Sequence, residues 1–284
     1  MAMILDGKAF AAECKAEIRR EAERLTALGC RPGLAVVLVG NNPASQVYVR
    51  NKENDCKECG IYSAMYTLPE ETPEAELLEL LDTLNGDRSV HGVLVQLPVP
   101  KQIDPQRVIE AIDPIKDVDC FHPMNVGYLT QGMARFAPCT PAGILRLMAR
   151  YGIDPAGKHC VVVGRSNIVG KPMSLLLLQG NGTVTICHSA TADLAAKTRQ
   201  ADILVSAVGK PGFLAGDMVK EGAVVIDVAM NRDAAGKLCG DAVYAEVAGK
   251  ASAITPVPGG VGPMTRVMLL ENTITACKLQ TGQD

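Results

Sequence analysis

The sequence has no excess of positive charge: 28 Lys and Arg residues stand against 31 Asp and Glu residues, for a net charge of -3. Nucleic-acid binding draws its affinity from clustered Lys and Arg that displace counterions, and this chain has no basic stripe. The start, Met1 to Lys15, lacks the apolar centre of a signal peptide and the length of a membrane span. We therefore expect a cytoplasmic protein with no nucleic-acid or membrane partner.

The chain also lacks the residue clusters that form disulfide frameworks or metal sites. Its ten cysteines are scattered singly, without the dense spacing of a secreted disulfide-bonded domain. One close pair, Cys56 and Cys59, lies within a helical pattern with no second Cys or His pair near it. No two of the four histidines have the spacing that places two ligands on one helix face. We expect reduced thiols and no metal.

What the sequence does contain is an alternation of strand-like and helix-like segments. Short runs rich in Val and Ile indicate buried strands, and segments of helical periodicity lie between them. This alternation predicts an α/β fold with parallel sheets covered by helices. The expected strands are residues 34–39, 90–97, 160–163, 184–187, 203–208 and 224–228. The expected helices are residues 8–28, 44–59, 73–84, 143–151, 170–179, 192–199 and 263–279.

The pattern is interrupted around residues 131–140, where glycine and prolines occur. This break predicts a boundary between two domains. We expect a first domain over residues 1–139 and a second over residues 140–269. A C-terminal helix at residues 270–284 would pack back on the first domain.

Two glycine-rich segments indicate ligand contacts. Residues 255–265 (TPVPGGVGPMT) hold three glycines and three prolines, which build a rigid loop whose backbone can approach a flat ligand. The strand that ends at Val163 leads into a turn, residues 164–170, and then into a helix with Pro172 in its first turn. Free amides and the helix dipole there predict an anion site that fits a pyrophosphate. The turn lacks the middle glycine of G-x-G-x-x-G, so a structural turn is the alternative.

The end of the next strand discriminates between the two nicotinamide cofactors. It leads into His188-Ser189-Ala190-Thr191, without the Asp or Glu that would bind a free ribose 2′-hydroxyl. The hydroxyls of Ser189 and Thr191 and the guanidinium of Arg165 suit a 2′-phosphate, which favours NADP over NAD. In the alternative, Arg165 caps a helix or pairs with an aspartate of the following helix.

The first half of the chain holds a group of candidate catalytic residues. Tyr48 and Lys52 are four residues apart and would share one face of a helix. A lysine in an apolar cleft has a lowered pKa suited to acid–base work, although a solvated surface lysine is the alternative. Gln96, near the end of an apolar strand, needs a hydrogen-bond partner, which Lys52 could provide. Asp117 and Asp119 share a loop, where one could bind an aminopyrimidine edge or both could cap turns.

Seven motifs, in order and nearly end to end, resemble the bifunctional methylenetetrahydrofolate dehydrogenase/methenyltetrahydrofolate cyclohydrolase family. They are ASQVYVRNK, GVLVQLPVP, KDVDCFHP, PCTPAGI, GRSNIVGKPM, TVTICHS and TPVPGGVGPMT. The resemblance implies a homodimer whose subunits have an N-terminal α/β catalytic domain, a C-terminal Rossmann-type doubly wound parallel sheet, and folate in the cleft between them. It implies oxidation of 5,10-methylenetetrahydrofolate with NADP and hydrolysis to 10-formyltetrahydrofolate at the same site.

The resemblance also implies roles for individual residues. Lys52 is similar to the catalytic lysine of the family, Gln96 to the partner of that lysine, and Tyr48 to the ring that stacks on the aminobenzoyl group. Asp119 is similar to the residue that anchors the pteridine. The further folate contacts that the resemblance implies are Leu97, Pro98, Pro258 and Gly259. The cofactor contacts that it implies are Gly164, Arg165, Ser166, Ile168, His188, Ser189 and Thr265.

The chain departs from the family pattern at four places. Cys120 stands where glycine is expected, which could tilt its loop and weaken folate binding. Ala190 replaces a basic residue and removes one possible phosphate partner. Ala229-Met230 replaces Gly-Ile near the nicotinamide, and Arg266 enters the apolar start of the last helix. The alternatives are another lysine-using dehydrogenase, a monofunctional variant, and a nonenzymatic NADP-binding protein.

Overall fold

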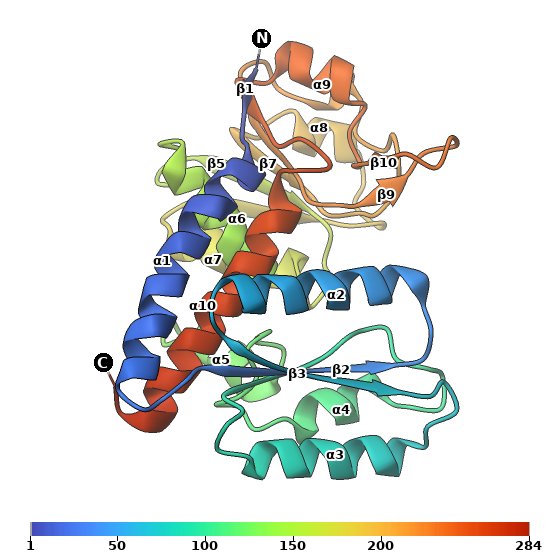
Figure 1. Cartoon of the computed structure of the whole chain (residues 1–284). Helices are drawn as coiled ribbons and strands as arrows, with labels where there is room; N and C mark the ends of the chain where they lie inside the picture. Colours follow the sequence, from blue (N-terminus) through green and yellow to red (C-terminus); the bar gives the residue numbers. More distant parts are fainter. Residues whose placement is uncertain (1, 284) are drawn as a thin grey trace. The chain divides into compact units, whose positions relative to one another are not determined.

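The computed structural model describes residues 2–283, which form two compact units. Unit 1 comprises the chain up to Ala12 together with Thr140–Thr265. Unit 2 comprises Glu13–Cys139 together with the chain from Arg266 onward. Figure 1 shows the elements of both units, coloured along the sequence.

Two long helices, α1 (Gly7–Ala27) and α10 (Val261–Thr281), each continue from one unit into the other. The start of the chain groups with unit 1 because strand β1 (Met3–Ile4) pairs with a strand of that unit. The division into functional domains at residues 139 and 140 stays a prediction. Its outermost residues, 1 and 284, lie outside the described part of the chain.

Unit 1 contains a six-stranded sheet in the order β1-β11-β8-β7-β5-β6, in which every neighbouring pair is parallel. The chain moves outward in one direction from β5 to β6 and in the other from β7 to β8, so the strand order reverses between β5 and β7. In doubly wound sheets, ligands bind outside the carboxyl ends of the strands at such a point. The strands after β1 are β5 (His159–Val163), β6 (Thr183–Cys187), β7 (Ile203–Ser206), β8 (Val224–Asp227) and β11 (Ala253–Ile254).

The sheet of unit 1 is packed with helices, as the continuous apolar strands predict. The central strand β7 is buried along its whole length, because both faces of a parallel sheet are covered. Helix α7 packs on β5 and β6. The helices and the small hairpin of this part of the chain are α6 (Cys139–Arg150), α7 (Gly170–Gln179), α8 (Leu194–Thr198), η1 (Gly216–Met218), β9 (Asn231–Arg232), β10 (Leu238–Cys239) and α9 (Tyr244–Lys250).

Unit 2 is built on a three-stranded parallel sheet in the order β3-β2-β4. Helix α2 lies over one face of this sheet, and α3 and α4 lie over the other (Figure 1). Leu77, Leu81 and Leu84 of α3 have helical spacing and pack against Val37 and Val93 in one apolar cluster. The elements are β2 (Gly33–Val39), α2 (Pro43–Glu58), β3 (Tyr62–Leu68), α3 (Glu74–Gly86), β4 (Gly92–Val95), α4 (Pro105–Ala111) and α5 (Pro123–Thr130).

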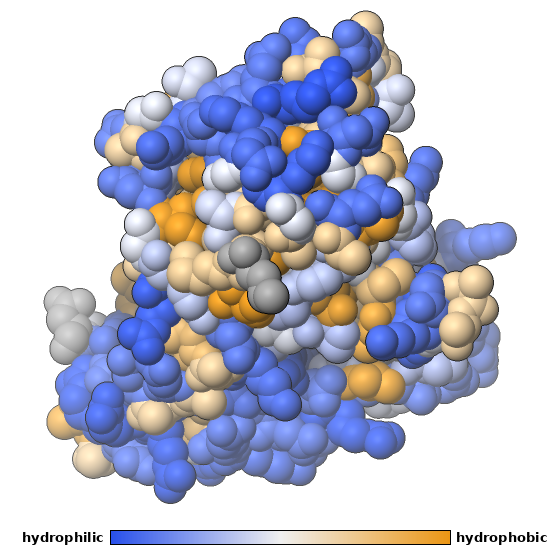
Figure 2. Space-filling view, turned by 90° about the horizontal axis from the view of Figure 1, so that it is seen from above, coloured by the Kyte–Doolittle hydropathy of each residue, from blue (hydrophilic) through white to orange (hydrophobic). Residues whose placement is uncertain are grey.

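The predicted strands and helices are present, with ends that differ by a few residues. The sequence pattern did not predict the edge strand β3, the short helices α4, α5 and α9, the short strands β1 and β11, or the β9–β10 hairpin. Within residues 2–283, no helix is long and apolar enough to cross a membrane. Most of the face shown in Figure 2 is hydrophilic, with apolar spots among the polar side chains.

Candidate functional site

Lys52 lies on α2 of unit 2, where its side chain is half-buried. Its Nζ donates a hydrogen bond of 3.0 Å to Gln96 Oε1. Gln96 directly follows β4, and its backbone N–H donates to Val37 O of β2 at 2.8 Å, so the sheet fixes its place. The side-chain amide of Gln96 in turn donates to Leu97 O at 2.8 Å. The contact between Lys52 and Gln96 that the sequence predicted is therefore present.

Burial and the charge of the partner side chain both shift the pKa values of Lys52 and Asp119. Burial lowers the pKa of the Lys52 ammonium, and the negative charge of Asp119 partly offsets this effect. Burial raises the pKa of the Asp119 carboxyl, and the positive charge of Lys52 opposes that shift. Since burial penalises the charged form of each group, the two side chains are easier to neutralise than solvated ones. A lysine whose pKa is lowered can act as a base at lower pH than a solvated lysine.

Asp117 and Asp119 occupy the same loop but differ in their bonding. The carboxylate of Asp117 accepts bonds from the backbone N–H of Phe121 at 3.2 Å and of His122 at 2.8 Å, and from Asn125 Nδ2 at 2.8 Å. Asp117 is thus a structural cap. The carboxylate of Asp119 has one weak donor among the described residues, Cys139 Sγ at 3.6 Å. Its remaining lone pairs can accept hydrogen bonds from a ligand.

Cys139 and Asn272 hold the Asp119 loop, a role that the sequence analysis missed. Cys139 Sγ donates to Val118 O at 3.4 Å. Asn272, on α10, donates from Nδ2 to Val118 O at 2.8 Å and to Ala137 O at 3.0 Å. Cys139 stands in the PCTPAGI motif, but nothing in the sequence pattern links Asn272 to a residue 154 positions away.

Two further features of unit 2 concern the predicted folate contacts. Tyr48 lies one turn before Lys52 on α2, and its side chain is 37% exposed. The peptide bond between Leu97 and Pro98 is cis, and these residues follow Gln96 directly. Unit 2 therefore holds the predicted catalytic residues and the first group of folate contacts.

Arg266, a departure from the family pattern, lies in the same unit. Its Nη1 is 3.1 Å from Oδ2 of the buried Asp55, which also forms an ion pair with Lys15 of α1. The ion pair gives a buried carboxylate a second cationic partner, so the departure has a structural explanation.

The glycines of the turn after β5 are required by close packing. Gly164 has φ +131°, and a Cβ there would lie 2.6 Å from Ala207 O at the end of β7. A Cβ on Gly170 would lie 2.2 Å from Gly164 O. Gly164 and Gly170 therefore permit the close approach of the turn to the segment after β7 and of the start of α7 to the turn.

The amides at the start of α7, which the sequence was expected to leave free for an anion, are hydrogen-bonded within the turn. Ser166 Oγ accepts the amides of Val169 at 3.2 Å and Gly170 at 3.3 Å, and Ser166 O accepts the amide of Lys171 at 3.0 Å. Pro172 has no amide hydrogen. In the turn itself, the amides of residues 165–168 form no hydrogen bond with any described residue. These four amides are therefore available to an anion.

Of the three groups predicted to bind a 2′-phosphate, Arg165 and Ser189 are exposed, whereas Thr191 is half-buried. Arg165 forms no hydrogen bond or ion pair with any other described residue, so the alternative in which it pairs with Asp193 is not observed. Asp193 instead accepts the amide of Ala196 and caps α8. Ser189 is exposed, whereas Thr191 Oγ1 accepts the amide of His188 at 2.9 Å and so already has a partner within its own turn. A free guanidinium and a free hydroxyl fit the NADP phosphate.

The remaining predicted contacts also lie in unit 1. The Val257–Pro258 bond is cis, and Gly259 has φ +109° and accepts the amide of Lys8 at 2.8 Å. Thr265 Oγ1 is 3.0 Å from Thr140 Oγ1. Pro258 and Gly259 thus belong to the unit that holds the cofactor residues, and their folate contact stays a prediction.

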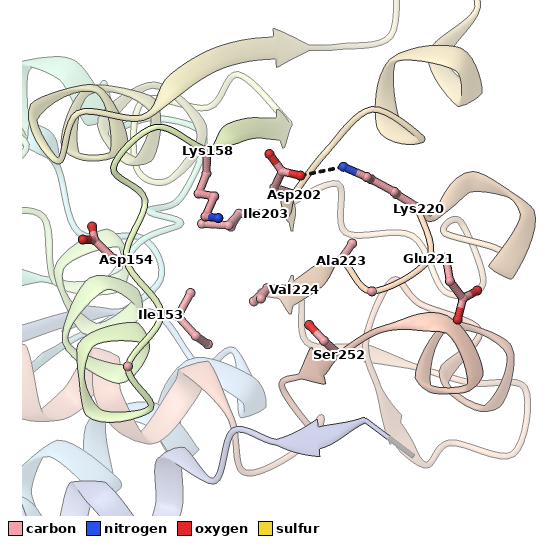
Figure 3. A pocket seen from close by; sticks show the side chains of 12 residues that line it. Ile153, Asp154, Lys158, Asp202, Ile203, Lys220, Glu221, Ala223, Val224 and Ser252 are labelled. Carbon is pink, nitrogen blue, oxygen red and sulfur yellow. Dashed lines mark hydrogen bonds and ion pairs between the residues drawn. The ribbon is translucent and has the colours of Figure 1, made fainter.

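A hollow in unit 1 lies at the amino ends of the strands, opposite their carboxyl ends (Figure 3). Its lining includes Lys158, Asp202, Ala223 and Ser252, each of which immediately precedes a strand. Lys220 Nζ is 2.6 Å from Asp202 Oδ1 across its rim. Because cofactors bind at the carboxyl ends of the strands, this hollow at the amino ends is not the cofactor site. In the described chain, no group of three or more His, Cys, Asp or Glu could hold a metal ion.

Comparisons with known proteins agree with this geometry. The catalytic domain of tetrahydrofolate dehydrogenase/cyclohydrolase matches residues 5–119, and the NAD(P)-binding domain of that family matches residues 138–281. The bifunctional protein FolD of Moorella thermoacetica is 60% identical over 277 residues, which are 98% of this chain and 99% of that protein.

Solved structures give the same result. The FolD methylenetetrahydrofolate dehydrogenase/cyclohydrolase of Campylobacter jejuni has a TM-score of 0.97 at 51% identity, over 99% of this chain and 100% of that one. The FolD of Trypanosoma brucei, solved with NADP and an inhibitor, has a TM-score of 0.94 at 38% identity, over 99% of this chain and 98% of that one.

These findings confirm the predicted α/β fold, the enzyme class and the cofactor NADP. The protein oxidises 5,10-methylenetetrahydrofolate to 5,10-methenyltetrahydrofolate by hydride transfer to NADP and hydrolyses the product to 10-formyltetrahydrofolate. Since both of its domains match and its relatives extend over nearly its whole length, the chain belongs to the tetrahydrofolate dehydrogenase/cyclohydrolase family.

Proposed function

We propose that both reactions use one folate site built around Lys52, in which Tyr48, Gln96 and Asp119 act on the substrate. The observation that supports this most is the 3.0 Å hydrogen bond from Lys52 to Gln96, at a half-buried lysine whose pKa burial lowers. A solvated surface lysine would have neither the partner nor the shift.

Substrate binding uses the acceptors and apolar surfaces of this group. The open lone pairs of Asp119 accept hydrogen bonds from the aminopyrimidine edge of the pteridine. The partly exposed ring of Tyr48 offers a face on which the aminobenzoyl group stacks. Leu97 and Pro98, beside Gln96, add apolar contact. Pro258 and Gly259 complete the set of folate contacts that we propose.

The hydrolytic step is where Lys52 acts chemically. Water attacks the methenyl carbon, and the neutral amine of Lys52 takes the proton that the attacking oxygen loses. The resulting ammonium then returns this proton to the folate nitrogen as the carbon–nitrogen bond breaks. The second hydrogen of the attacking water leaves to solvent as the formyl C=O forms, so hydrolysis of the methenyl cation releases one proton. Gln96 Oε1 accepts a hydrogen from Nζ and thereby holds the amine in place for both transfers.

The oxidation step needs less from these side chains. NADP, when bound, supplies the acceptor for the hydride that leaves the one-carbon bridge. No proton leaves the substrate in that step, so Lys52 only helps to orient it. The cofactor contacts that we propose are Gly164, Arg165, Ser166, Ile168, His188, Ser189 and Thr265.

Three broader features follow from the family resemblance and stay proposals. We propose that residues 1–139 form the folate-binding domain and residues 140–269 the NADP-binding domain, with the final helix returning to the first domain. We further propose that the protein is a homodimer and acts in the cytoplasm. Analytical ultracentrifugation at micromolar concentration tests the homodimer directly.

The first experiment mixes the purified protein with methylenetetrahydrofolate and either NADP or NAD, and follows reduced cofactor and methenyl product by absorbance without acid quenching. Reduction with NADP and little methenyl accumulation, relative to spontaneous hydrolysis without enzyme, is the expected result. Accumulation of methenyltetrahydrofolate would indicate a site that oxidises but does not hydrolyse. If folded protein reduces neither NADP nor NAD, the alternatives are a lysine-using dehydrogenase that acts on another substrate and a nonenzymatic NADP-binding protein.

A further inference from the structure

Asp241 is a buried acid of unit 1 that none of the roles above uses. Asp241 is 0% exposed, and its carboxylate accepts four hydrogen bonds. Oδ2 accepts from Ser206 Oγ at 2.8 Å and from the amide of Val208 at 2.8 Å. Oδ1 accepts from the amide of Lys210 at 2.8 Å and from Asn231 Nδ2 at 3.0 Å. These four hydrogen bonds fix the positions of Ser206, Val208, Lys210 and Asn231 around one carboxylate.

The segment that Asp241 holds, residues 206–210, borders the cofactor crevice. It begins at the carboxyl end of β7, beside the point where the strand order reverses. The amide of Ala207 donates to Val163 O of β5 at 2.8 Å. A Cβ on Gly164 would lie 2.6 Å from Ala207 O, so this segment and the cofactor turn are in contact. A shift of residues 206–210 would therefore reach the surface that meets the cofactor.

Asp227 keeps Asp241 in place. The carboxylate of Asp227 accepts the amide of Asp241 at 2.9 Å and the amide of Ala242 at 2.8 Å. A Cβ on Gly240 would lie 2.0 Å from Asp227 Oδ2, so glycine is required there for this approach. The amide of Asp227 donates to Thr255 Oγ1 at 2.8 Å. Asp241 is thus supported from the ends of β8 and β11 while it holds the end of β7.

Only a carboxylate can serve all four donors at once. Asparagine would present one NH₂ group, which donates where Asp241 accepts. Ser206 and Asn231 can reorient to accept from it, but the amide of Val208 or of Lys210 would then lose its acceptor. The backbone of residues 206–210 must move to find another.

We propose that Asp241 is a positioning residue for the oxidation step: it sets residues 206–210 as the wall against which NADP binds. This inference rests on the proposed function, since it requires that hydrolysis depends on Lys52 in unit 2 while oxidation also depends on the crevice of unit 1. Asp241 touches neither substrate nor cofactor and acts through the backbone of Val208 and Lys210.

The test compares Asp241→Asn with wild type in two separate assays. NADP-dependent oxidation of methylenetetrahydrofolate is measured in one, and hydrolysis of supplied methenyltetrahydrofolate without cofactor in the other. We expect kcat/KM for oxidation to fall by about 10-fold to 100-fold with a raised KM for NADP, and hydrolysis to stay within about twofold. In the protein without cofactor, hydrogen exchange at the amides of residues 206–210 should accelerate.

Asp202→Asn is the matched control. Asp202 also accepts a backbone amide, that of His159 at 2.9 Å, but at the amino end of the same sheet. Both activities and the exchange at residues 206–210 should stay within about twofold in this variant.

Ser206→Ala, which removes one donor and keeps the acid, covers the case in which Asp241→Asn does not fold. We expect oxidation to fall by about twofold to fivefold in this variant, with hydrolysis unchanged. Equal loss of both activities, or unchanged oxidation in a folded variant, would overturn the inference. Failure of wild type to hydrolyse would instead overturn the proposed function, so the two failures are distinguishable.

Discussion

The two units contain buried or half-buried carboxylates with opposite bonding. Asp241 of unit 1 has four donors, each within 3.0 Å. Asp119 of unit 2 has one described donor, a thiol at 3.6 Å, and burial raises its pKa. A protein satisfies its buried polar groups wherever they only support the fold. The acid with open acceptors, Asp119, is therefore the one that we propose binds a ligand, whereas the hydrogen bonds of Asp241 support the backbone around it.

The same contrast separates neighbours of like chemistry. Asp117, two residues from Asp119, has three donors and caps a turn. Arg165 has no partner among the described residues, whereas Arg199 of the same unit donates to Asp217 O at 3.2 Å. Open hydrogen-bonding capacity thus marks the candidate site more specifically than residue type does.

Removal of the amine at the open site is expected to have the largest effect. Lys52→Met should lower hydrolysis by about 10² to 10⁴-fold, because acid–base catalysis is lost, and should leave a larger share of the oxidation. Both activities are measured on protein whose fold is checked by circular dichroism. Lys57→Met is the control, since Lys57 lies on the same helix, is exposed and forms an ion pair with Glu53 at 2.7 Å. Equal loss of both activities in a folded, folate-binding Lys52→Met protein would contradict the proposal.

The unpartnered guanidinium provides the next test. Arg165→Ala should raise the KM for NADP by about 10-fold to 100-fold, because a charge-assisted contact to the 2′-phosphate is lost, and should leave the KM for NAD unchanged. Steady-state kinetics with both cofactors measure this. Arg199→Ala, at the end of the short helix α8, should change neither value. An equal rise in KM for NADP and NAD would show that Arg165 does not recognise the 2′-phosphate.

Local sequence patterns predicted the parts of the site that lie close in the chain or on a strand. The spacing of Tyr48 and Lys52 placed both on one helix face, and the isolated amide of Gln96 required a partner. The continuous apolar strands predicted both parallel sheets. The edge strand β3 was missed because it is half-buried along most of its length, with neither a fully apolar run nor strict alternation.

Contacts between distant polar residues could not be predicted. Asn272 meets Val118 across 154 residues, and Asp241 meets Ser206 across 35 residues, and neither pair has a periodicity. The bonded amides at the start of α7 could not be predicted for a similar reason. The sequence places Ser166 correctly in the turn, but it does not show that the hydroxyl bonds to the amides of Val169 and Gly170.

The pH dependence of hydrolysis tests how the charge of Asp119 affects Lys52. Because burial lowers the pKa of Lys52, the neutral amine should appear below the usual lysine range, and hydrolysis should rise by about tenfold per pH unit up to a plateau. The charge of Asp119 raises the pKa of Lys52, so Asp119→Asn should move this rising limb to lower pH. The measurement is a pH–rate profile of methenyltetrahydrofolate hydrolysis, with the spontaneous rate subtracted. If the rising limb stays at the same pH in Asp119→Asn, the charge of Asp119 does not influence the pKa of the group that controls hydrolysis.

The smallest expected effect concerns Cys120, where the family pattern has glycine. Cys120 has φ +62°, a left-handed conformation that costs a side chain about 1–2 kcal/mol. Its buried Sγ, 3.4 Å from Phe136 O, offsets part of this cost, and glycine would add freedom to the unfolded chain. Cys120→Gly should therefore change the free energy of unfolding by less than about 1 kcal/mol.

The matched variant Cys120→Ala separates these terms. Alanine keeps the strained φ and loses the thiol, so Cys120→Ala should be less stable than both wild type and Cys120→Gly in urea unfolding. In both variants the KM for methylenetetrahydrofolate should stay within about threefold of wild type. Asn272 and Cys139 still hold the neighbouring Val118 carbonyl, so the loop keeps the place of Asp119. A much larger gain in folate affinity in Cys120→Gly would show instead that the thiol tilts this loop, and that the acid with open acceptors is poorly placed in the natural chain.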